Sequence, residues 1–155
     1  MNTVISIDRE LKWLRRMVGE WELRQEYYCF PDETQVLCGR ESVKLIGGRW
    51  IMAQMVLETY SRTSTLDYDP VKGLFVGTAI DSLSNHLWLH EAALEAGALT
   101  LETFGPEYPV GDEPFFPIRE VIMFSDEDRR VSQRSVLREC GEWQLLIETH
   151  ARRVG

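Results

Sequence analysis

The sequence predicts an all-β protein, an up-and-down antiparallel β-barrel of about ten strands with a short N-terminal helix that closes one end. Three observations support this fold class. After Gly19, apolar residues alternate with polar ones at the two-residue period of a strand. The successive runs are joined by short turns, as in an antiparallel meander. An open sheet of that size would leave two unpaired edges and tend to curl, so closure into a barrel is favoured.

All 155 residues are expected to form one domain, with the helix at about 7–18 and the barrel at about 20–153. A chain of this length can bury one sizeable core and is too short for two ordinary domains. Hydrophobic residues make up 44% of the chain and charged residues 27%. This balance is normal for a globular protein and argues against long disordered segments.

The helix is predicted from apolar residues at helical spacing, which are Ile7, Leu11, Leu14 and Val18. Ser6 or Asp8 is available as the N-cap, and Gly19 follows the last turn and ends the helix. Residues 1–6 have the character of a loose leader.

The strands are predicted from alternating runs bounded by turn residues. The first begins at Trp21, which faces inward, and ends at Cys29. The others are expected at about Gln35–Leu45, Arg49–Tyr60, Thr63–Tyr68, Leu74–Asp81, His86–Ala93, Ala98–Thr103, Ile118–Phe124, Arg130–Leu137 and Trp143–Arg153. Phe104–Pro117 is the longest irregular stretch. Loops of that length in a compact domain are often functional lids.

The formal net charge of −8 argues against two classes of partner. An acidic surface repels phosphate backbones and anionic lipids, so neither nucleic acid nor a membrane is expected to bind. No apolar run approaches the roughly 20 residues that cross a bilayer, and the N-terminus lacks the features of a signal peptide. Three cysteines without a CxxC spacing favour reduced thiols. We therefore expect a cytoplasmic protein.

Several short motifs together resemble those of a known family. Gly19-Glu20-Trp21 after a short helix is similar to the G-x-W signature of the calycin superfamily, and Arg152 or Arg153 would match the arginine that packs over its tryptophan. The fuller pattern resembles a bacterial domain-of-unknown-function family with a lipocalin-like barrel. It comprises Glu41-Ser42-Val43, Gly47-Gly48-Arg49-Trp50, Tyr68-Asp69-Pro70, Phe75-Val76-Gly77-Thr78, Asp81-Ser82, His86-Leu87-Trp88 and Gly141-Glu142-Trp143. The resemblance covers nearly the whole chain and implies the barrel, with structural roles for Trp21, Arg152 and Arg153. It carries over no catalytic residues.

Alternate connections of an up-and-down barrel lie at the same end. If the helix closes the end at which the first strand starts, residues 82–85 and 104–117 are neighbours at the open end. We therefore expect an aromatic mouth, with the ligand candidates Tyr27, Phe104, Tyr108, Phe115 and Phe116. Exposed aromatic residues there could instead form a homodimer contact.

Polar residues on inward faces are further candidates, because a buried charge is costly unless it is paired. By strand parity these are Glu41, Gln54, Glu58, either Arg119 or Glu120, and Arg134. Two interpretations remain open. The first is an internal ion-pair network, such as Glu41 with Arg119 or Arg134. The second is an anchor for the polar head group of a ligand.

The histidines do not predict a metal site. In a strand that rises about 3.3 Å per residue, His86 and His90 would lie roughly 13 Å apart, too far to share one ion. His86 at the mouth could ligate a haem iron, as in some related barrels, or simply be a hydrogen-bonded loop residue. No other cofactor is predicted. Asp81, Ser82 and His86 have the types of a hydrolytic triad, but they lie too close in sequence to form the relay.

We therefore expect a barrel that encloses a small, largely apolar or amphipathic molecule. Its ligand-binding candidates are Tyr27, Glu41, Gln54, His86, Phe104, Phe115, Phe116 and Arg119. A second hypothesis is an enzyme in which an inward carboxylate, Glu41 or Glu120, transfers protons together with His86. No nucleophile elbow, P-loop or dinucleotide fingerprint supports a specific enzyme class. Haem binding through His86 and a filled barrel that acts as a structural or interaction protein are the third and fourth hypotheses.

Overall fold

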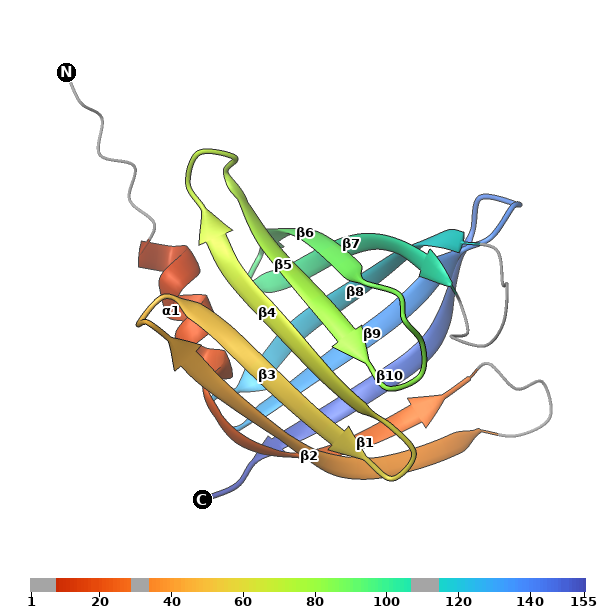
Figure 1. The fold of residues 1–155 in the computed structure, drawn as a ribbon, viewed down its shortest axis with the longest axis horizontal. Helices are drawn as coiled ribbons and strands as arrows, with labels where there is room; N and C mark the ends of the chain where they lie inside the picture. Colours follow the sequence, from red (N-terminus) through yellow and green to blue (C-terminus); the bar gives the residue numbers. More distant parts are fainter. Residues whose placement is uncertain (1–7, 29–33, 107–114) are drawn as a thin grey trace.

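The computed structural model describes residues 8–28, 34–106 and 115–155. These residues form one helix and a closed antiparallel barrel (Figure 1). The elements are α1 Asp8–Met17, β1 Gly19–Tyr27, β2 Gln35–Ile46, β3 Trp50–Leu57, β4 Ser61–Asp69, β5 Leu74–Asp81, β6 Trp88–Glu95, β7 Ala98–Pro106, β8 Phe115–Asp126, β9 Arg129–Leu137 and β10 Trp143–Arg153. Each strand pairs with its chain neighbours, and β10 pairs with β1 to close the barrel. The predicted fold class is confirmed.

Successive strands run in opposite directions between a closed end and a mouth. Figure 1 shows α1 across one end of the barrel, so β1, β3, β5, β7 and β9 all finish at the opposite end. The predicted arrangement of the connections is therefore confirmed. Within the described ranges, no helix has the length and apolar character needed to cross a bilayer.

Several element boundaries differ from the sequence-based expectation, and three of the differences concern the predicted aromatic mouth. β7 continues to Pro106 and β8 begins at Phe115, so both ends of the expected loop at 104–117 are strand. Residues 107–114, which include Tyr108, lie outside the described residues, as do the leader at 1–6 and the turn at 30–33. β6 begins at Trp88, so His86 precedes it instead of starting it.

The helix closes the barrel with a buried face that is wider than the apolar stripe predicted from the sequence. Trp13, Leu14 and Met17 are its buried residues, whereas Leu11 and Val18 are only partly buried beside them. The Trp13 indole N–H donates to the carbonyl oxygen of Gly97 at 3.2 Å. A helix of only ten residues would not be stable alone, so this packing holds it in place.

Trp21 is completely buried where α1 joins the barrel, and its indole N–H donates to the Met17 carbonyl at 2.9 Å. The guanidinium of Arg153 lies 4.3 Å from the Trp21 ring and donates to the Val18 carbonyl at 2.6 Å. A Cβ at Gly19, where φ is +140°, would lie 2.3 Å from Arg153 Nη1, so only glycine fits. Of the two candidate arginines, Arg153 is therefore the one that packs over Trp21.

Arg152 points elsewhere and pairs with Glu22 on the outer surface at 2.5 Å. Neighbouring residues of a strand face opposite sides of the sheet, so only one of the two arginines could reach the buried indole.

Candidate functional site

A cavity of about 340 Å³ lies inside the barrel. It extends from Met17 and Glu41 near the closed end to Leu83 and Pro106 near the mouth. Much of its wall is apolar, and this part includes Ile51, Ala53, Met55, Leu66, Leu101, Ile122 and Leu146. Such a wall arises because inward positions of the strands alternate with outward ones and are mostly occupied by aliphatic side chains.

One polar cluster in the cavity joins two tyrosines to an amide. The hydroxyls of Tyr27 and Tyr60 lie 2.6 Å and 2.8 Å from Gln25 Oε1 and 2.9 Å from each other. Burial raises the pKa of Tyr60, so its hydroxyl keeps its proton at neutral pH. Tyr27, one of the candidates at the mouth, lines the cavity, and its role in ligand binding stays a prediction.

A second cluster brings two arginines to one indole. The guanidinium carbons of Arg62 and Arg134 lie 5.7 Å and 4.6 Å from the Trp88 ring centroid. Arg62 approaches Asp81 at 3.5 Å, and Arg134 approaches Glu120 at 3.7 Å. Burial, and next the nearby Arg62, lower the pKa of Arg134 to about 10, which leaves it protonated at neutral pH.

His90 lies in the same part of the cavity and is buried, with 6% of its surface exposed. Burial, followed by the positive charges of Arg62 and Arg134, lowers the pKa of His90 to about 3. The imidazole is therefore neutral at pH 7, and it is a weak base for proton transfer. Among the described residues, neither His90 Nδ1 nor Trp88 Nε1 has a hydrogen-bond partner, although both atoms are buried.

Glu41 faces the cavity as predicted, but its partner is Arg130. The sequence-based pairings with Arg119 or Arg134 were wrong. Arg130 lies 4.6 Å from the Trp21 ring, so this buried ion pair belongs to the closed end of the barrel. Burial lowers the pKa of Arg130 to about 9, which leaves this guanidinium protonated at neutral pH. The geometry gives Glu41 a structural partner and places it away from the Trp88 cluster.

Three candidate inward residues face outward. Gln54 is exposed, because the inner face of β3 carries the alternate residues Ile51, Ala53, Met55 and Leu57. Arg119 lies on the outer face of β8, where it stacks on Trp143 at 4.1 Å and approaches Glu102 at 3.6 Å. Of the two alternatives Arg119 and Glu120, Glu120 is therefore the residue that lines the cavity. Glu58 is also exposed.

His86 sits at the rim and does not line the described cavity. Its ring packs edge-on against Trp88 at 4.6 Å and Phe115 at 4.8 Å, and its Nε2 lies 3.2 Å from the Phe104 carbonyl oxygen. Gly105 permits this contact, because a Cβ there would meet both the Trp88 ring and His86 Nε2. The haem and proton-transfer hypotheses through His86 stay predictions.

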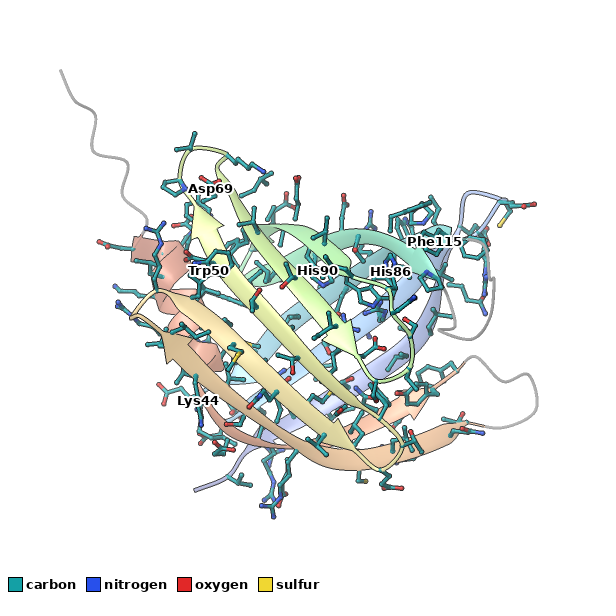
Figure 2. All side chains as sticks on the ribbon, in the orientation of Figure 1. Lys44, Trp50, Asp69, His86, His90 and Phe115 are labelled. Carbon is teal, nitrogen blue, oxygen red and sulfur yellow. The ribbon has the colours of Figure 1, made fainter. Side chains whose placement is uncertain are left out.

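Some of the aromatic residues at the rim face solvent, and one packs against the interior of the barrel. In Figure 2, His86 and Phe115 lie together at the mouth, and His90 lies closer to the end that α1 closes. Phe104 and Phe115 are 56% and 48% exposed, with their ring centroids 5.8 Å apart. Phe116 packs instead against the buried cluster around Trp88. Their expected place at the mouth is correct, but Phe104 and Phe115 do not line the cavity.

Sequence reasoning missed Arg62, Trp88 and His90 as a group. β4 is polar on both faces and β6 has bulky residues at both parities, so neither strand showed an inner face. A usable signal did exist: Trp88 and His90 are two residues apart and must share a face. Among the described residues, no three His, Cys, Asp or Glu side chains are placed to hold a metal ion.

Comparison with known proteins places the chain in a family. It belongs to the family described as "Protein of unknown function (DUF1579)", whose model matches residues 7–153. No curated protein matches the chain significantly.

Two solved structures illustrate the shared fold. Rv2717c from M. tuberculosis is 11% identical with a TM-score of 0.67, and the match covers 94% of this chain and 97% of that one. The S-type phycobiliprotein lyase CPES from Guillardia theta is 12% identical with a TM-score of 0.58, covering 97% of this chain and 99% of that one. At these identities, the likeness establishes the lipocalin-like fold alone.

Proposed function

We propose that this member of the family is a binding protein that holds a small, largely apolar or amphipathic molecule inside its barrel. The observation that carries the proposal is the cavity of about 340 Å³, with an apolar wall and a few converging polar groups. Ligand sites in proteins have this character and span roughly 300–1,000 Å³. A filled barrel with a purely structural role would not retain such a space, because protein interiors are close-packed.

The size of the cavity limits the ligand. At about 30 Å³ for a water-sized group, the space holds roughly eleven such groups, the size of a medium-chain amphiphile. A solved protein of the same fold is named as a phycobiliprotein lyase, which is consistent with a barrel that accommodates a small molecule. Location in the cytoplasm and a homodimer contact stay predictions.

Two measurements test the proposal on the purified protein. Native mass spectrometry should detect a retained small molecule, or a one-to-one complex after addition of N-phenyl-1-naphthylamine. The fluorescence of this neutral probe should increase on transfer into the apolar cavity. A clean mass of the protein alone, together with no change in probe fluorescence, would rule out the container function.

A pair of variants locates the binding. Ala53→Phe places a ring in the cavity, whereas Gln54→Phe places the same ring on the outer face of β3. We expect Ala53→Phe to weaken probe binding at least tenfold and Gln54→Phe to leave it within a factor of two. Far-ultraviolet circular dichroism checks that both variants retain the barrel. Equal binding by the two variants would place the probe outside the cavity.

A further inference from the structure

We infer that the ligand carries an anionic group, in the simplest case a carboxylate, which binds between Arg62 and Arg134 beside Trp88 and His90. The inference rests on the proposed function, because it specifies which molecule the cavity would hold. Its basis is the arrangement of four side chains from three strands, β4, β6 and β9.

The two arginines converge from different strands on one indole. Arg62 and Arg134 lie 5.7 Å and 4.6 Å from the Trp88 ring, and both line the cavity. Their side chains are only 16% and 14% exposed. Two like charges brought together in a buried place repel each other, and an anion between them would relieve this repulsion.

Neither arginine is fully engaged by its acidic neighbour. The contacts of Arg62 with Asp81 and of Arg134 with Glu120 measure 3.5 Å and 3.7 Å. Charge-assisted hydrogen bonds between such groups are typically about 2.7–2.9 Å long. The fork of donors on each guanidinium therefore retains capacity for another acceptor.

Asp81 is also committed elsewhere, because its Oδ1 accepts the backbone N–H of Leu83 at 3.0 Å. One of its oxygens thus holds the connection between β5 and β6. Its other oxygen, Oδ2, approaches Arg62 at 3.5 Å, so Asp81 meets this arginine through a single oxygen and not as a bidentate pair.

Two buried polar atoms of β6 point to the same ligand chemistry. Trp88 Nε1 and His90 Nδ1 have no partner among the described residues, and their residues are 3% and 6% exposed. An orphaned buried donor costs free energy, so native proteins rarely retain one without cause. The indole nitrogen can only donate, so the missing group must be an acceptor. The tautomer of neutral His90 with its proton on Nδ1 supplies a second donor.

The acceptor and the two cations together specify an anion. An ammonium group would be repelled by Arg62 and Arg134 and could not accept from Trp88. A neutral hydroxyl could accept one hydrogen bond but would add no negative charge, so the two guanidiniums would keep only their long contacts with Asp81 and Glu120. The aliphatic wall, which includes Ile51, Ala53 and Leu66, would hold the apolar part of the molecule.

Competition among molecules of equal chain length tests the inference. Octanoate, octanol and octylamine are each titrated at pH 7.5 against bound N-phenyl-1-naphthylamine. We expect octanoate to displace the probe at a concentration at least tenfold below octanol, and octylamine to be the weakest. Equal displacement by octanoate and octanol, or a preference for octylamine, would overturn the inference while leaving the proposed function in place. Failure of the probe itself to bind would instead refute the proposed function.

Paired variants test the assigned residues without leaving a charge unpaired. The double variant Arg134→Gln/Glu120→Gln removes an ion pair that lines the cavity. The double variant Arg119→Gln/Glu102→Gln is the control, because it removes an ion pair on the outer face of the barrel. The double variant in the cavity should reduce the protein's preference for octanoate over octanol at least fivefold. The outer pair should leave it unchanged.

Trp88→Phe removes the donor and keeps an aromatic ring. It should lower the same preference about threefold, and thermal unfolding shows whether each variant is folded. A preference that is unchanged in both folded cavity variants would overturn the assignment to these residues.

Discussion

Acidification should destabilise this protein through His90. Burial, and then the charges of Arg62 and Arg134, lower the pKa of His90 from 6.5 to about 3. Between these values the unfolded chain binds a proton that the folded protein excludes. The free energy of unfolding therefore falls as the pH falls through this window, and the contribution is fully present above about pH 6.5.

The magnitude follows from the two pKa values. One pKa unit corresponds to about 1.4 kcal/mol, so lowering the pH from 7 to 5 should cost about 2 kcal/mol through this imidazole alone. Urea denaturation at both pH values measures the free energy of unfolding. His90→Gln cannot take up the proton, so the wild-type protein should lose about 2 kcal/mol more than the variant between pH 7 and pH 5.

The comparison isolates His90, because the carboxylates titrate in both proteins. Equal losses of stability in the wild type and His90→Gln would refute the reasoning. They would mean that the folded protein accommodates the protonated imidazole, either through water or through a partner that the buried geometry does not provide.

Three further predictions concern the closed end and the rim. Glu41→Gln leaves Arg130 buried without its counter-ion and should lower the free energy of unfolding by about 3–5 kcal/mol, measured by urea denaturation. Adding Arg130→Met should recover part of that loss, and no recovery would contradict the buried-pair explanation. Gly19→Ala forces a Cβ against Arg153 and should cost about 1–3 kcal/mol, visible as a lower melting temperature. Titration with haemin tests the haem hypothesis: a Soret shift that disappears in His86→Ala would support it, and no shift would reject it.

The barrel could be predicted from the sequence because its signals are local and repeated. Alternation, turn residues and the shift of period at Gly19 occur many times, so errors at single boundaries do not change the topology. The inward position of Glu41 was predictable for the same reason, since its neighbours Leu37 and Val43 share its face.

The binding cluster could not be predicted because it depends on orientation in strands with ambiguous faces. In β3, apolar residues occupy both odd and even positions, so the sequence does not show which face points inward. Gln54 was assigned to the inner face, and an error of one position places every side chain of a strand on the opposite face. Glu41 meets Arg130 rather than Arg119 or Arg134, because the curvature of the closed barrel brings together β2 and β9, which are not neighbours in the sheet. Such contacts across the interior leave no trace in sequence spacing.

The indole resonance of Trp88 gives the most direct test of the claim that the barrel is a container. Trp88 lines the cavity, whereas Trp50 and Trp143 are exposed on the surface. On titration with N-phenyl-1-naphthylamine in a ¹H–¹⁵N correlation spectrum, the Trp88 indole N–H signal should shift and saturate at one equivalent, while the signals of Trp50 and Trp143 stay in place. Shifts confined to Trp50 or Trp143, with Trp88 unchanged, would contradict binding inside the barrel.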